Sequence, residues 1–185
     1  IVFVNKMDRV GADFYKCIED VKRKLEGKVY PLFLPIGKEA GFSGLIDIVN
    51  KSAYMYDTSD SLGIKFNITK VPDNYQGLFL KYRNSLIEHL ADLDDEVAEL
   101  YLNDTDLDST FLKTKIRKHV IARDLVIAIP GSSFKNKGVQ MLLDSIVDYL
   151  PSPFDLKPIA LYEKNKVTSY LKFNDKRTVG LVFKI

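Results

Sequence analysis

The stretch that decides the fold opens the chain and reads Ile1-Val2-Phe3-Val4-Asn5-Lys6-Met7-Asp8-Arg9. Its first four residues are β-branched or aromatic, a composition typical of a buried parallel strand. After the polar loop, apolar residues recur on one face of a predicted helix, at Phe14, Cys17, Ile18, Val21 and Leu25. Strand, loop and helix in this order predict an α/β fold with the loop at the carboxyl end of a strand, where such folds bind ligands.

The loop carries side chains suited to recognising guanine. Guanine presents two adjacent donors, N1–H and the N2 amino group, and the carboxylate of Asp8 can accept from both. Adenine lacks these donors and would leave the carboxylate unpaired, which costs enough to discriminate strongly between the bases. Lys6 can lay its methylene stem along the base, and Asn5 can tie the loop to its neighbours. A polar turn without a ligand is the alternative interpretation.

A second stretch later in the chain repeats the arrangement. An apolar run at residues 125–129 precedes Gly131-Ser132-Ser133-Phe134-Lys135-Asn136-Lys137-Gly138-Val139-Gln140, and a predicted amphipathic helix follows. The small residues at 131–133 let the backbone approach a planar ligand closely. We therefore predict that the amide of Ser133 donates to guanine O6 while Ser132 braces the loop. A Gly/Ser turn with solvated lysines is the alternative here.

Together these segments resemble the elongation factor G family, the bacterial or organellar translational GTPases that move transfer and messenger RNA through the ribosome. The resemblance covers nearly the whole chain. It is carried by the two loops, by Pro35-Ile36-Gly37 through Gly44-Leu45-Ile46-Asp47, by Tyr149-Leu150-Pro151-Ser152-Pro153 and by Phe183-Lys184-Ile185. It implies that GTP or GDP is bound by Asn5, Lys6, Asp8, Ser132, Ser133 and Phe134.

The resemblance also implies partners and an activity. The full-length protein would hydrolyse GTP and work on the ribosome as a monomer, meeting the tRNA–mRNA complex indirectly and the acidic stalk protein through an inserted subdomain. Related ribosomal GTPases, of the recycling, tetracycline-protection or release-factor type, are the alternatives within the same class. A non-hydrolysing module that binds the stalk is the alternative from a different class.

The parts of a GTPase that handle phosphate are missing from the sequence. No Gly-Lys-Ser/Thr of a phosphate loop occurs, and a GTPase also needs a magnesium-binding threonine and a water-positioning residue. The first residue already lies in a predicted strand, and residues 179–185 are again strand-like. We therefore expect an internal fragment with no catalytic residue or metal ligand of its own, inactive alone, whose Mg²⁺ ligands belong to the rest of the parent protein.

The spacing of the two loops sets the predicted domain organisation. More than 100 residues separate them, far more than a usual strand-to-helix connection, so an inserted subdomain is required. We predict a partial P-loop GTPase-type doubly wound sheet at residues 1–27 and 125–158, interrupted by an α+β insert at 28–124. Residues 159–185 would be the first strands of a β-barrel domain. Within the insert, short strands are expected at 29–34 and 46–49, with helices from residue 72 onward.

Composition agrees with a globular protein and excludes little else. The chain is 46% hydrophobic and 28% charged, and its formal net charge of +2 does not indicate nucleic-acid binding by charge alone. The single cysteine, Cys17, is expected to be buried, and it has no partner for a disulfide within the chain. This favours a reducing compartment, the bacterial cytoplasm or an organellar matrix or stroma. No apolar run is long enough for a membrane span, so no membrane partner is expected.

Overall fold

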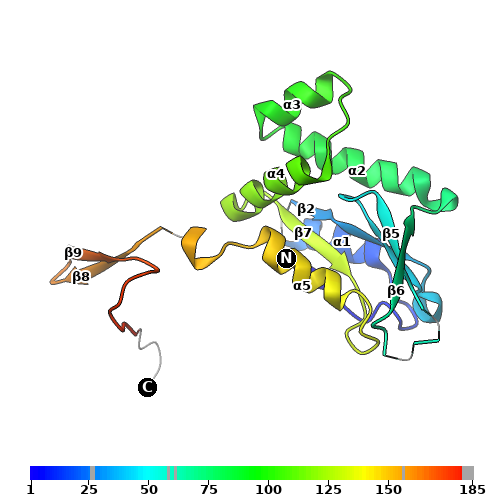
Figure 1. The fold of residues 1–185 in the computed structure, drawn as a ribbon, viewed down its shortest axis with the longest axis horizontal. Coiled ribbons are helices and arrows are strands. Elements are labelled where there is room, and N and C mark those ends of the chain that lie inside the picture. Colours follow the sequence, from blue (N-terminus) through cyan, green and yellow to red (C-terminus); the bar gives the residue numbers. More distant parts are fainter. Residues whose placement is uncertain (26–27, 58, 61, 156, 181–185) are drawn as a thin grey trace. The chain divides into compact units, whose positions relative to one another are not determined.

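The computed structural model describes residues 1–185 except 26–27, 58, 61, 156 and 181–185. Two compact units make up the chain, Ile1–Leu150 and Pro151–Ile185. Figure 1 shows the course of the chain. The first unit contains β1 (Val2–Val4), α1 (Phe14–Leu25), β2 (Val29–Pro31), β3 (Phe33–Ile36), β4 (Gly44–Asp47), β5 (Ser52–Tyr56), β6 (Phe66–Lys70), α2 (Gln76–Ala91), α3 (Asp95–Leu102), α4 (Ser109–Ala122), β7 (Val126–Pro130) and α5 (Val139–Tyr149).

A parallel sheet forms the centre of the first unit. Its strand order is β1-β7-β2, with Val2 opposite Ala128 and Val29 opposite Val126. The central strand β7 is apolar on both faces, and its residues Ile127 to Ile129 are fully buried. In the view of Figure 1, α5 lies in front of this sheet and α1 behind it. Helices on both faces of a parallel sheet confirm the predicted α/β fold class.

The insert is built on a second, antiparallel sheet with the strand order β3-β4-β5-β6. The predicted strand at 29–34 is divided at Leu32. The Leu32 amide donates to the carbonyl of Ala128 in the parallel sheet, and the Leu32 carbonyl accepts from the amide of Ile48 in the insert, each at 3.0 Å. The chain thus passes from one sheet to the other at a single residue. β2 lies in the parallel sheet, although its residues fall within the predicted insert, which begins at residue 28. The domain boundaries remain a prediction.

Helices α2, α3 and α4 follow the antiparallel sheet, as the apolar pattern from residue 72 predicted. The apolar face of α2 comprises Phe79, Leu86 and Leu90, which are buried, and Tyr82, which is half-buried. Arg83, which no pattern in the sequence marks as buried, is 4% exposed on the same face. Its guanidinium donates to the backbone carbonyls of Ile48 and Leu107, each at 2.7 Å. Buried loop carbonyls need donors, and the planar guanidinium supplies several from one side chain.

The expectation of a buried Cys17 is wrong, because this side chain is exposed. Phe14 and Ile18 form the buried stripe of α1 as predicted. The neighbouring position that packs inward is Tyr15, whose ring stacks on Tyr82 of α2 with centroids 5.6 Å apart. α2 therefore rotates the contact face of α1 away from Cys17. A tertiary contact that the helical period does not encode decides which edge of the stripe is covered.

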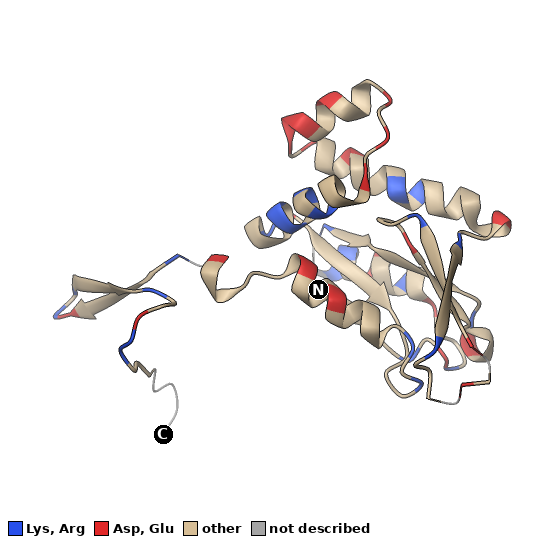
Figure 2. Ribbon diagram, viewed as in Figure 1, with Lys and Arg blue, Asp and Glu red and all other residues tan. Residues whose placement is uncertain are grey.

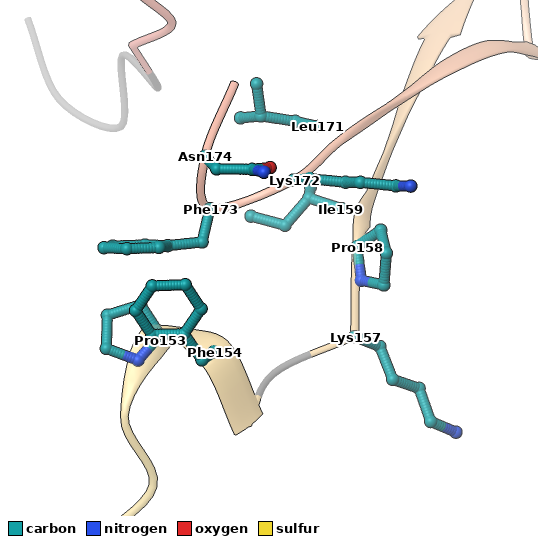
Figure 3. A pocket seen from close by; sticks show the side chains of 9 residues that line it. All are labelled: Pro153, Phe154, Lys157, Pro158, Ile159, Leu171, Lys172, Phe173 and Asn174. Carbon is teal, nitrogen blue, oxygen red and sulfur yellow. The ribbon is translucent and has the colours of Figure 1, made fainter. Parts of the chain in front are cut away.

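The second unit contains an antiparallel hairpin of β8 (Ile159–Glu163) and β9 (Lys166–Leu171). An open apolar cavity of about 650 Å³ lies beside the hairpin (Figure 3). The rings of Phe154 and Phe173, which line this cavity, pack edge to face with their centroids 4.2 Å apart. The predicted strand at 179–185 falls largely outside the described residues, and Val179 and Gly180 lie in no strand. The β-barrel assignment stays a prediction. Among the described helices, none is long and apolar enough to cross a membrane.

Candidate nucleotide-binding site

The two predicted guanine loops leave the parallel sheet side by side. Because β1 and β7 are neighbouring parallel strands, their carboxyl ends meet at one edge of the sheet. The strand pairing continues into both loops through Gly131. Its amide donates to the carbonyl of Val4, and its carbonyl accepts from the amide of Met7, each at 3.0 Å. The backbone therefore fixes the separation of the loops before any side chain contributes.

Asn5 joins the first loop to the second. Its Oδ1 accepts from the amide of Ser133 at 2.9 Å and from the hydroxyl of Ser133 at 3.1 Å. The same oxygen accepts from the amide of Lys6 at 2.8 Å. This is the tie predicted for Asn5. It also means that the Ser133 amide, predicted to donate to guanine O6, already has a partner, whereas the Phe134 amide makes no hydrogen bond to any described residue.

The first loop turns sharply at Lys6, which has a left-handed backbone with φ of 64°. A non-glycine residue in this region carries strain, and such residues cluster at ligand sites. The turn is closed by a hydrogen bond of 3.0 Å from the Arg9 amide to the Lys6 carbonyl. Met7 points inward and is 3% exposed, while the Lys6 side chain is exposed. The loop is therefore anchored by Met7 and presents Lys6 to solvent.

The surroundings of Asp8 keep its carboxylate ionised. A hydrogen bond from the Ser132 hydroxyl is the main cause that lowers the pKa of Asp8 below its ordinary value; partial desolvation opposes it, and the charges of Arg9 and Lys135 add to the lowering. Ser132 itself is fully buried, and its backbone pairs in both directions with Lys137, at 2.8 and 3.0 Å. The predicted bracing role of Ser132 thus has a direct structural counterpart, since Ser132 connects the loop to Asp8.

A cavity of about 340 Å³ adjoins Asp8. Its walls come from the second loop and from the insert, and its lining residues are Asp8, Ala40, Phe42, Asp57, Asp60, Gly63, Lys135 and Lys137. Phe134 lies outside it and is 82% exposed, so it is available to cover a ligand at the loop surface. The described residues contain no group of three or more His, Cys, Asp or Glu side chains arranged to hold a metal ion.

All six residues predicted to bind guanine lie in these two adjoining loops. Asp8 supplies a carboxylate that can accept hydrogen bonds, Lys6 is an exposed cation, and Phe134 offers a backbone amide. The sequence did not indicate two residues of the insert that touch the second loop, Phe42 and Tyr56, which lie 95 and 82 positions from their partners Lys137 and Gly138. No local motif marks them, because their contact depends on the packing of the antiparallel sheet.

Comparisons with known proteins identify the family of the chain. The family described as the elongation factor Tu GTP binding domain matches residues 1–152. Elongation factor G 2 of Desulfotalea psychrophila is 41% identical over the whole chain, and the chain spans 27% of that protein's length. A crystal structure of a Thermus thermophilus protein matches with a TM-score of 0.70 and 27% identity over 85% of this chain and 23% of that one. The resemblance to elongation factor G is thereby confirmed, and the chain belongs to the family of elongation factor Tu-type GTP-binding domains.

Proposed function

We propose that this chain supplies the guanine-recognition half of the nucleotide site in an elongation factor G-type GTPase, which moves tRNA and mRNA through the ribosome. The observation that carries the proposal is the tie from Asn5 Oδ1 to the amide and hydroxyl of Ser133. It joins two loops separated by the whole insert into one binding surface. The family match and the relative described as elongation factor G 2 support the same conclusion.

In this proposal each residue has a defined part. The ionised carboxylate of Asp8 accepts from guanine N1–H and N2–H₂. The stem of Lys6 and the exposed ring of Phe134 cover the faces of the base. Because the amide of Ser133 is held by Asn5, the neighbouring amide of Phe134 is the better donor to guanine O6. Asn5 and Ser132 hold the two loops in register.

The chemistry of hydrolysis lies elsewhere in the parent protein. The sequence contains no phosphate loop, so the groups that hold the phosphates and Mg²⁺ come from outside these residues. The isolated chain is therefore expected to hydrolyse no GTP. When bound, Mg²⁺ neutralises charge on the phosphates, while the residues described here orient the base.

The proposed partner is the ribosome, with the insert as the part that meets the acidic stalk protein, in the bacterial cytoplasm or an organellar matrix or stroma. Exposed apolar residues on the insert helices, Leu80 and Leu102, support a contact surface there. Figure 2 shows basic residues along α4. Lys113 already pairs with Asp148 within the unit, and Lys115 and Lys118 pair with Asp94. Lys115 also pairs with Glu96, so charge alone does not carry the stalk contact.

Turnover by the full-length parent protein tests the function. GTP and ATP hydrolysis would be measured with and without ribosomes, together with movement of mRNA in a pre-translocation complex. Ribosome-stimulated GTP hydrolysis with mRNA movement is expected. Stimulated hydrolysis without movement would assign the protein to a recycling, tetracycline-protection or release-factor type. Ribosome binding without hydrolysis would instead favour the stalk-binding module.

A further inference from the structure

The second guanine loop is held from the side by the insert, and Lys137 makes the central contact. Its ammonium donates to the backbone carbonyl of Phe42 at 2.6 Å. It also lies over two aromatic rings, 5.9 Å from the centroid of Phe42 and 5.6 Å from that of Tyr56. Burial lowers the pKa of the Lys137 ammonium, and repulsion from Lys135 adds to this. A cation between two rings and a carbonyl is held in one place.

A second contact acts on the next residue. The hydroxyl of Tyr56 accepts from the amide of Gly138 at 2.5 Å, and Tyr56 is 6% exposed. Gly138 has φ of 83°, and a side chain there would come within 2.7 Å of the Pro130 carbonyl. This left-handed turn leads directly into α5. The insert therefore fixes two consecutive residues at the point where the loop becomes a helix.

The backbone carries this restraint to the residue that reads the base. Lys137 exchanges two hydrogen bonds with Ser132, and Ser132 in turn is the main partner of Asp8. Movement of Lys137 would shift Ser132 and remove support from the Asp8 carboxylate. No other lysine among the described residues combines a contact to the insert with backbone pairing in this loop.

We propose that Lys137 is a positioning residue for the guanine site: its ammonium clamps the second loop to Phe42 and Tyr56 of the insert and so sets how long a guanine nucleotide stays bound. The inference rests on the proposed function, because it assumes that the loops bind guanine. It adds a residue that acts on the base-reading carboxylate through Ser132, and it assigns the antiparallel sheet a part in nucleotide retention.

Release of fluorescent mant-GDP from the full-length parent protein tests the proposal. Lys137→Met keeps the side-chain stem and removes the ammonium, so release should become at least about tenfold faster, the usual effect of losing a charged hydrogen bond. Lys137→Arg retains a cation that can donate to Phe42, and release should stay within about threefold of wild type. The control Lys70→Met removes an equal charge from exposed strand β6 and should change release by less than about twofold.

Two further readouts separate positioning from general loss of structure. Tyr56→Phe removes the acceptor of the Gly138 amide and should speed release about fivefold. In both clamp variants the KM for GTP in ribosome-stimulated turnover should rise more than kcat falls. Wild-type retention of GDP by both Lys137→Met and Tyr56→Phe would overturn the clamp while leaving guanine binding intact. A wild-type protein that binds no mant-GDP would instead overturn the proposed function.

Discussion

The two guanine loops differ in what holds them. The first loop, residues 5–9, is mostly exposed and carries Asp8, and side-chain hydrogen bonds connect it to the second loop, from Ser133 to Asn5 and from Ser132 to Asp8. The second loop, residues 131–138, is braced by the insert at three places: Lys137 on Phe42, Gly138 on Tyr56, and the Lys135 carbonyl against Gly63. Both loops take part in recognition, but contacts from the insert concentrate on the second one.

The largest effect is expected from Gly131→Ala, which breaks the junction between both loops. An added Cβ would lie 2.5 Å from the ring of Phe3 and 2.7 Å from the carbonyl of Lys137. Both loops must shift to relieve these contacts, at a cost of about 3 kcal/mol. We expect GDP affinity to fall by about a hundredfold, measured by isothermal titration of the full-length protein.

Gly77→Ala is the matched control for this substitution. Gly77 lies in α2, and nothing is within 4 Å of an added Cβ. Alanine is favoured over glycine in a helix, so stability should stay equal or rise by about 1 kcal/mol, with GDP affinity unchanged. Wild-type affinity in Gly131→Ala would show that the close approach of the loops is not needed for binding.

A smaller effect is expected from Asn5→Ala, which removes the connection to Ser133 and leaves the backbone pairing and the Ser132–Asp8 hydrogen bond intact. Three donors lose their acceptor, the amides of Lys6 and Ser133 and the hydroxyl of Ser133. These groups are exposed and can turn to water, so we expect about a tenfold loss of GDP affinity in the same titration. Asn103→Ala, at an exposed helix end, serves as the control. Equal affinities in the two variants would remove Asn5 from the site.

Ser133→Ala sharpens the comparison by testing the amide apart from the hydroxyl. The hydroxyl bond to Asn5 is lost, but the amide bond of 2.9 Å remains. GDP affinity should change by less than about threefold, since an exposed neutral hydrogen bond contributes little. A loss as large as that of Asn5→Ala would assign the connection to the hydroxyl instead.

The smallest effect on nucleotide is expected from Asp94→Asn, which weakens the insert far from the loops. Burial by itself raises the pKa of Asp94, but hydrogen bonds from Lys115 and Lys118 at 2.8 and 2.6 Å outweigh it, so the pKa lies well below its ordinary value. The ion pair therefore stabilises α3 and α4 above about pH 4 and is lost as the solution becomes more acidic.

Native-state hydrogen exchange measures this change directly. Amides of α4 should open about 1 kcal/mol more easily in Asp94→Asn at pH 7, because Lys115 and Lys118 lose their charged partner while Lys115 keeps Glu96 at 2.6 Å. The difference from wild type should shrink as the pH falls below about 4. GDP affinity should stay within about twofold. A large loss of affinity would show that the helices of the insert also support the site.

Much of the fold follows from local patterns. The apolar runs at residues 1–4 and 125–129 predicted the two strands that carry the loops, and both lie in the parallel sheet. The cap of α4 shows the limit of such patterns. Serine is a common cap, but Ser109 is the first helical residue, and the neighbouring Asp108 accepts from the amides of Thr110 and Phe111. Adjacent polar residues compete for this position, and the bend of the incoming chain decides between them.

The site was predictable where one residue type performs one chemical task, as for Asp8 with guanine. The partners Phe42 and Tyr56 were not, because they depend on strand pairing across the insert. The same limit explains why a strand predicted at 29–34 divides at Leu32 between two sheets. Apolar periodicity predicts that a segment is buried, but not which sheet it joins.

Competition between GDP and XDP for the full-length protein tests the central claim most directly. The carboxylate of Asp8 accepts from the N2 amino group of guanine, whereas the amide of Asp8→Asn can donate to the C2 carbonyl of xanthine. We predict that wild type prefers GDP and that Asp8→Asn prefers XDP, a reversal of about a hundredfold or more. Since the pKa of Asp8 is lowered, the wild-type preference should hold from pH 8 to about pH 5. An unchanged preference for GDP in Asp8→Asn would contradict the account.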